Sequence, residues 1–166
     1  MTEPVVIGLG GNVGTEAEIL QRFGDARAAL AAIGAVRSAR LYRSAPLGPA
    51  QPAFLNTAVR VALDDAQPDE LIGTLLELEY LLGRRREAEA RWGPRPLDLD
   101  VLVWGARVVR TPSLEVPHPR LIERKFALAP LIDLVGDDFA IPGAGSAGAA
   151  LRRVADQVCE DIAATW

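Results

Sequence analysis

The stretch LDLDVLVW, residues 97–104, decides the fold predicted from this sequence. Apolar and acidic residues alternate in its first half, and alternate side chains of a β-strand point to opposite faces. Asp98 and Asp100 therefore share one face. The other face carries an apolar row, formed by Leu97, Leu99, Val101 and Val103. We expect this row to pack on a core and the two carboxylates to lie on a functional surface.

Upstream of this strand, the pattern predicts three more strands and two helices. The strands are expected at residues 5–9, 36–42 and 54–63. In the third of them, Phe54 and Asn56 lie on the face opposite its own apolar row. One helix is expected between Thr15, which begins a capping box, and Gly34. The other is expected between Pro68, a favoured first residue, and Gly83.

The order strand, helix, strand, strand, helix, strand predicts an α+β fold. It matches a ferredoxin-like βαββαβ sandwich, with an antiparallel sheet and both helices on one face. The opposite face is expected to remain available for a ligand. C-terminal additions are expected as a short strand at residues 107–110, a helix at 124–134 and a terminal helix at 147–164. We expect residues 1–166 to form a single domain, because no repeat or linker interrupts the pattern.

Composition limits the class of function. A formal charge of −4 disfavours nucleic-acid binding, because phosphates demand a basic surface. No apolar run approaches the roughly 20 residues that cross a bilayer, and the N-terminus lacks the features of a signal peptide. Cys159 is the only cysteine, so no intramolecular disulfide is possible. We expect a cytoplasmic monomer that acts on small molecules, with neither nucleic acid nor membrane as a partner.

Asp98 and Asp100 are candidate metal ligands. Magnesium prefers sparse carboxylate ligation completed by water and substrate phosphates. An isolated Asp-X-Asp is more often a solvated strand face. Five arginines within residues 84–95 favour the phosphate interpretation here, since guanidinium groups pair well with phosphate oxygens. Glycine and proline in the same stretch predict a mobile, basic lid beside the carboxylates.

Three other features admit more than one interpretation. Glu79 lies near the end of the second helix, where the dipole disfavours a carboxylate, and it is either functional or paired with a following arginine. The run GLGGN at residues 8–12 fits neither a dinucleotide motif nor a P-loop, so it predicts a tight turn. His118 is the only histidine, and a lone histidine is usually structural, although the prolines on both sides fix its backbone.

Six motifs together resemble the 6-hydroxymethyl-7,8-dihydropterin pyrophosphokinase family in order and spacing. They are GLGGN (8–12), YRSAPLG (42–48), QPAFLN (51–56), EYLLGRRR (79–86), RWGPRPLDLD (91–100) and VPHP (116–119). The resemblance runs from residue 5 to about residue 134, and the block from RWGPR to the aspartates is highly specific. It implies transfer of the β,γ-pyrophosphoryl group of ATP to the hydroxymethyl group of the pterin, with release of AMP.

The same resemblance implies a role for each matching residue. ATP is the co-substrate, and two Mg2+ ions bind to Asp98 and Asp100. The pterin stacks between Phe54 and Phe126, and its edge is read by Ser44, Pro46, Leu47 and Asn56. The implied ATP contacts are Glu79, Arg86, Trp92, Arg95, Val101, His118 and Arg124. Arg84 and Trp92 order and close the lid, and the implied catalytic residues are Arg84, Arg95 and Asp98.

Some positions depart from the family pattern, and two other classes of protein compete with it. Leu76, Ser113 and Glu115 stand where some relatives place polar or basic nucleotide contacts, and the lid is one residue longer than in some relatives. Metal-dependent nucleotide-sugar transferases also use Asp-X-Asp, but this short chain has no leading Rossmann-like series. A ferredoxin-like RNA-binding or regulatory domain is disfavoured by 5% aromatic residues and net acidity.

Overall fold

The computed structural model describes residues 2–166 and is built around an antiparallel sheet of six strands. The order along the sheet is β10-β3-β4-β1-β5, and β2 also pairs with β4. These strands are β1 (Thr2–Gly11), β2 (Ala35–Ser38), β3 (Leu41–Ser44), β4 (Phe54–Asp64), β5 (Asp98–Trp104) and β10 (Cys159–Ala163). Two small hairpins stand apart, β6 (Val109–Arg110) with β7 (Glu115–Val116) and β8 (Ala140–Ile141) with β9 (Gly145–Ser146).

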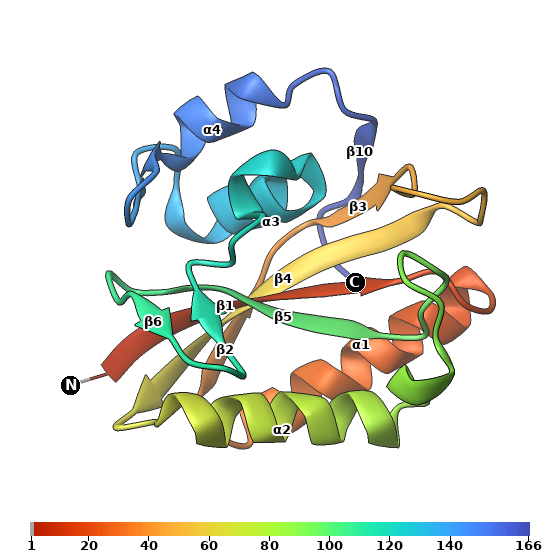
Figure 1. Cartoon of the computed structure of the whole chain (residues 1–166), viewed down its shortest axis with the longest axis horizontal. Helices are drawn as coiled ribbons and strands as arrows, with labels where there is room; N and C mark the ends of the chain where they lie inside the picture. The colour runs from red at the N-terminus through yellow and green to blue at the C-terminus, as the bar shows by residue number, and fades with distance from the viewer. Residues whose placement is uncertain (1) are drawn as a thin grey trace.

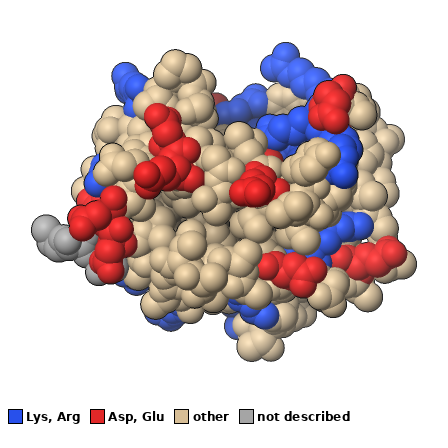
Figure 2. Space-filling model, turned by 90° about the horizontal axis from the view of Figure 1, so that it is seen from below, with Lys and Arg blue, Asp and Glu red and all other residues tan. Residues whose placement is uncertain are grey.

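Helices lie on both sides of this sheet (Figure 1). One side carries α1 (Glu16–Ala31) and α2 (Pro68–Leu81), and the other carries α3 (Lys125–Val135) and α4 (Ala147–Arg153). The surface on the side of α1 and α2 has acidic side chains spread across it, with basic side chains gathered mostly toward one corner (Figure 2). None of the helices described in residues 2–166 has the length and apolar character that a membrane crossing requires.

Each side of the sheet has its own hydrophobic core. Under α1 and α2, the core includes Phe23, Leu30 and Leu75 packed on the sheet. On the other side, Leu128 and Leu131 of α3 pack on the sheet. The second core corrects the expectation that this face of the sheet would remain open, because α3 and α4 cover part of it. The part that they leave uncovered forms the cleft described below.

The first four predicted strands and two predicted helices are present, with sharper boundaries. The Thr15 hydroxyl accepts from the Glu18 N–H, and the Glu18 carboxylate accepts from the Thr15 N–H, so the capping box begins α1 as predicted. The predicted strand at 36–42 is divided into β2 and β3, which pair with different parts of β4. At the break, the Thr57 hydroxyl donates to the Arg40 carbonyl at 2.9 Å.

Two predictions about alternation and turns were wrong in detail. The register between β1 and β5 shifts between Val6 and Ile7, and this bulge moves Val103 out of the row of Leu99 and Val101 and into the second core. The run GLGGN was predicted as a turn, but β1 continues to Gly11. It does so because β4 and β5 pair with β1 on its two sides, which no local pattern reveals.

The predicted terminal helix at residues 147–164 was also wrong. Helix α4 ends at Arg153, and the following β10 pairs antiparallel with β3 at the edge of the sheet. The backbone groups of an edge strand offer hydrogen bonds to any segment that reaches them. Tertiary pairing with β3 therefore decides the conformation of this segment, whatever its local preference.

Candidate active site

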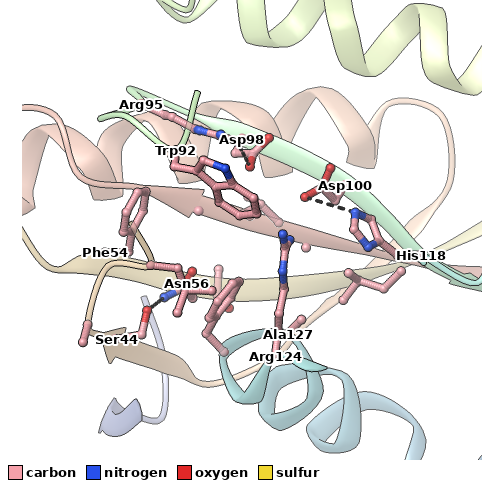
Figure 3. Close-up of a pocket in the computed structure, with 18 of the residues that line it drawn as sticks. Ser44, Phe54, Asn56, Trp92, Arg95, Asp98, Asp100, His118, Arg124 and Ala127 are labelled. Atoms are coloured by element: carbon pink, nitrogen blue, oxygen red, sulfur yellow. Dashed lines mark hydrogen bonds and ion pairs between the residues drawn. The ribbon is translucent and has the colours of Figure 1, made fainter. Parts of the chain in front are cut away.

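The uncovered part of the sheet forms a cleft beside α3 (Figure 3). Its floor comes from β1, β4 and β5, and one wall comes from residues 82–97, which connect α2 to β5 and are called the lid below. Eleven of the residues implied by the sequence line this one cleft. They are Ser44, Leu47, Phe54, Asn56, Trp92, Arg95, Asp98, Asp100, His118, Arg124 and Phe126.

Glycines make the floor of the cleft flat. Gly8 and Gly10 lie in β1, where Gly8 pairs with Asp100 and Gly10 pairs with Asp98. A Cβ atom added to Gly10 would lie 3.3 Å from Asn56 Oδ1. The absence of side chains at these two positions leaves space between the amide on β4 and the carboxylates on β5. Sequence analysis did not assign these glycines to the site, although glycine at alternate positions of a strand was the available signal.

Ser44 and Asn56 form a buried polar pair at one end of the cleft. Asn56 Nδ2 donates to Ser44 Oγ at 2.6 Å, and both residues are at most 5% exposed. Phe54, two residues before Asn56 on β4, also lines the cleft, as does Phe126 at the start of α3. Aromatic surface next to a fixed amide is the combination that a flat heterocycle with polar edges requires.

Asp98 is held by two guanidinium groups. Arg84 Nη1 donates to Asp98 Oδ1 at 2.7 Å, and Arg95 Nη1 donates to Asp98 Oδ2 at 2.8 Å. Burial alone raises the pKa of Asp98, but the positive charges of Arg84 and Arg95 outweigh it and bring the pKa below its usual value. Asp98 is therefore a carboxylate throughout the neutral pH range.

Asp100 differs from its neighbour in charge. Burial and the Asp98 carboxylate raise the pKa of Asp100 to about 7. Burial and the positive charge of Arg124 lower the pKa of His118 to about 4. His118 Nε2 lies 3.9 Å from Asp100 Oδ2. Figure 3 shows the two side chains pointing toward each other. Because the His118 imidazole is uncharged at neutral pH, its contact with Asp100 is not an ion pair.

Glu79 and Arg84 do not line the cleft, but Arg84 donates a hydrogen bond to Asp98, which does. Glu79 is 1% exposed and Arg84 is 4% exposed. Glu79 accepts hydrogen bonds from Arg84 Nη1, from Arg86 Nη2 and from the Leu99 N–H. The structure therefore supports the interpretation in which Glu79 pairs with the arginines that follow it.

The lid is joined to the rest of the cleft at Trp92. This residue has a positive φ of 63°, which is rare outside glycine, and its indole lies 4.3 Å from the Arg120 guanidinium. Gln51 Nε2 donates to the Trp92 carbonyl at 2.6 Å. Gly48 also packs closely here, because a Cβ atom on it would lie 2.9 Å from the Trp92 Cβ. Backbone strain of this kind is concentrated at functional sites.

Five predicted site residues do not line the cleft. They are Pro46, Glu79, Arg84, Arg86 and Val101. Val101 is 2% exposed and belongs to the core beneath α1 and α2, on the other side of the sheet. Leu76 is an exposed residue of α2, and Ser113 and Glu115 belong to the β6–β7 region, so none of these three lines the cleft.

The donor set at β5 suits magnesium. Asp98 and Asp100 supply carboxylate oxygens on one face of a strand, within an arginine-rich cleft. Mg2+ is commonly held by one or two carboxylates together with water and substrate phosphates. Among residues 2–166, no group of three or more His, Cys, Asp or Glu side chains is arranged to hold a metal.

Known proteins resemble this chain in sequence. A family model described as 7,8-dihydro-6-hydroxymethylpterin-pyrophosphokinase (HPPK) matches residues 6–136. A 2-amino-4-hydroxy-6-hydroxymethyldihydropteridine pyrophosphokinase of Synechocystis sp. is 38% identical over 97% of this chain and 78% of that protein. The protein of the same name from Pseudomonas aeruginosa is 41% identical over 82% of this chain and 83% of its own.

A solved structure supports the fold. Plasmodium falciparum HPPK-DHPS, wild type with SDX-DHP, aligns with 92% of this chain at a TM-score of 0.70 and 11% identity. This chain covers only 44% of that longer protein, and at such low identity the likeness concerns the fold alone. The sequence relatives and the family model carry the assignment. The chain belongs to the 7,8-dihydro-6-hydroxymethylpterin-pyrophosphokinase family.

Proposed function

We propose that this chain transfers the β,γ-pyrophosphoryl group of ATP to the hydroxymethyl oxygen of 6-hydroxymethyl-7,8-dihydropterin. AMP and the pterin diphosphate are the products, and the reaction is a step of folate biosynthesis. The observation that carries the proposal is that two carboxylates, two guanidinium groups and two aromatic rings share one cleft. They belong to Asp98, Asp100, Arg95, Arg124, Phe54 and Phe126.

The pterin is assigned to the part of the cleft that contains Phe54, Phe126 and Asn56. A flat ring gains both apolar burial and stacking between aromatic side chains. Because Asn56 Nδ2 is engaged by Ser44, its Oδ1 is the atom that remains to accept from the N–H groups at the pterin edge. Leu47, which is 45% exposed at the rim, adds apolar surface.

The phosphates of ATP are assigned to the arginine side of the cleft, with two Mg2+ ions at Asp98 and Asp100. Mg2+ supplies charge neutralisation between the carboxylates and the phosphate oxygens when it is bound. Arg95 and Arg124 then stabilise negative charge that develops on the transferred group. The pterin hydroxyl oxygen forms a bond to the β-phosphorus, and the bond from that phosphorus to the α–β bridging oxygen breaks. The bridging oxygen leaves as part of AMP, and the hydroxyl proton passes to water.

We further propose a ferredoxin-like topology and a monomeric state. The strand order β3-β4-β1-β5, with α1 and α2 on one face, supports the topology. The monomeric state is the expectation drawn from the sequence. Light scattering on the purified protein tests this point, since a dimer has twice the mass of the 17.8 kDa chain.

The reaction is tested by following nucleotides in the presence of dihydropterin, ATP and Mg2+. AMP should form only when all three are present, and formation of ADP or free phosphate instead would exclude pyrophosphoryl transfer. Asp98→Asn and Asp100→Asn should each lose nearly all activity while retaining the thermal unfolding transition. Asp138→Asn, an exposed carboxylate outside the cleft, is the matched control and should keep full activity.

A further inference from the structure

The lid contributes a carboxylate, Glu89, to a buried charge cluster beneath the cleft. The Nε–H of Arg84 is shared between both Glu89 oxygens, at 3.0 and 2.9 Å. The Arg84 side chain is only 4% exposed and the Glu89 side chain only 15%. An ion pair this well shielded from water is much less screened than a surface pair.

Arg84 has two further carboxylate partners. Its Nη1 donates to Glu79 Oε2 and to Asp98 Oδ1, at 2.7 Å each. Glu79 is itself fixed by the Leu99 N–H at 2.8 Å. Glu79 and Glu89 thus hold the guanidinium at two of its nitrogens, Nη1 and Nε. Arg84 in turn fixes Asp98 Oδ1, while Arg95 fixes the other oxygen, Oδ2.

We propose that Glu89 is a positioning residue for Asp98 and acts through Arg84. The inference rests on the proposed function, in which Asp98 is a magnesium ligand. Carboxylates that bind metals are oriented by their own hydrogen-bond partners, and loss of such a partner typically weakens metal binding by about 10–100-fold. Glu89 does not contact Asp98 itself: it holds Arg84, and Arg84 holds the proposed metal ligand Asp98.

Loss of the Glu89 charge should also weaken metal binding at Asp98. Without Glu89, the positive charge of Arg84 is balanced by Glu79 and Asp98 alone, and Glu79 is also shared with Arg86. Arg84 would then hold Asp98 more strongly and would repel a divalent cation more strongly. Both effects make the Asp98 carboxylate less available to Mg2+.

The lid offers a matched control for this charge. Glu87 lies in the single turn η1 (Arg86–Ala88), two residues from Glu89, but it is exposed and forms no ion pair with any residue in 2–166. Glu87→Gln and Glu89→Gln therefore remove the same charge from the same loop. Only Glu89→Gln removes a charge that is paired with Arg84.

The test measures Mn2+ binding, followed by loss of the free-ion EPR signal, in the presence of the unreactive analogue α,β-methylene ATP. Glu89→Gln should bind Mn2+ about tenfold more weakly than the unmodified chain, and Glu87→Gln should differ by less than about twofold. Glu89→Asp, which restores the charge, should recover part of the loss. The Mg2+ concentration for half-maximal AMP formation should rise in Glu89→Gln, with the rate largely recovered at saturating Mg2+.

A double-variant comparison separates positioning from general charge effects. In an Arg84→Gln background, Glu89→Gln should cause no further loss of Mn2+ affinity, because the connection to Asp98 is already broken. Equal losses in Glu87→Gln and Glu89→Gln, or a full additional loss in the Arg84→Gln background, would overturn the role of Glu89. Failure of the unmodified chain to bind Mn2+ with the analogue would overturn the magnesium site itself, and the inference with it.

Discussion

Asn12 and Arg95 exchange two hydrogen bonds. The Asn12 N–H donates to the Arg95 carbonyl, and the Arg95 N–H donates to Asn12 Oδ1, each at 2.9 Å. Asn12 Nδ2 also donates to Gln51 Oε1 and to the Pro52 carbonyl, again at 2.9 Å. One buried amide therefore joins three segments that are far apart in the sequence: the end of β1, the loop before β4, and the lid.

Replacement of Asn12 by Ala should destabilise the protein by about 2–3 kcal/mol. The side chain is 3% exposed, and its loss leaves the Arg95 N–H and the Pro52 carbonyl without their partner in partly buried surroundings. Urea unfolding followed by circular dichroism measures the change. Gln51→Ala, which removes only one partner of Asn12, is the control. A loss no greater in Asn12→Ala than in Gln51→Ala would contradict the central role of this amide.

The raised pKa of Asp100 predicts a pH dependence of stability in the metal-free protein. Between the ordinary carboxyl pKa near 4 and the folded value of about 7, the folded chain keeps a proton that the unfolded chain has released. Stability therefore falls as the pH rises through this window, and the Asp100 contribution is constant above it. Because the side chain is 37% exposed, the effect is on the order of 1 kcal/mol.

Asp100→Asn should remove this dependence. In EDTA, the variant should gain stability relative to the unmodified chain at pH 8, and the two should differ less at pH 4. The measurement is the urea midpoint at the two pH values, with Asp138→Asn as the control for general loss of charge. An unchanged difference between pH 4 and pH 8 would show that Asp100 ionises normally.

Phe126→Ala should weaken pterin binding by about tenfold, since it removes one aromatic surface of the proposed slot. Binding of the ATP analogue should change little. Isothermal titration with the pterin measures the loss. Phe139→Ala removes another partly buried phenylalanine, packed on the second core but outside the cleft, and serves as the control. Equal pterin affinity in Phe126→Ala and the unmodified chain would refute this role of Phe126.

Strand parity predicted the central arrangement of the cleft. The alternation at 97–104 placed Asp98 and Asp100 on one face of their strand. The alternation at 54–63 placed Phe54 and Asn56 on the face opposite their own apolar row. All four side chains line the cleft. Parity succeeds here because each strand buries one face under α1 and α2. It failed at Val103, where a bulge set by pairing with β1 breaks the period.

Long-range contacts account for the other differences. Nothing local to Glu89 distinguishes it from Glu87, because its partner Arg84 is selected by the path of the lid. The glycines at positions 8 and 10 suggest a turn until the strands on both sides are known. The same holds for the C-terminal strand β10, which pairs with β3, and for Trp166 after it, which donates to the Ala39 carbonyl. Both contacts join segments more than 100 residues apart.

Trp166 at the C-terminus should contribute measurably to stability. Its ring contacts Phe23 edge-on at 5.9 Å between centroids, its face lies 4.2 Å from the Arg27 guanidinium, and its Nε1 donates to the Ala39 carbonyl at 3.0 Å. Because the side chain is only partly buried, Trp166→Ala should cost about 2 kcal/mol rather than the 3–5 kcal/mol of a core aromatic.

Trp166→Phe separates these contributions. It retains a ring against Phe23 but loses the hydrogen bond to Ala39, so it should lose about 1 kcal/mol. Both variants should keep full AMP formation well below their unfolding temperatures, since Trp166 does not line the cleft. If Trp166→Ala unfolded at the same temperature as the unmodified chain, the contacts with Phe23, Arg27 and Ala39 would carry no net stabilisation.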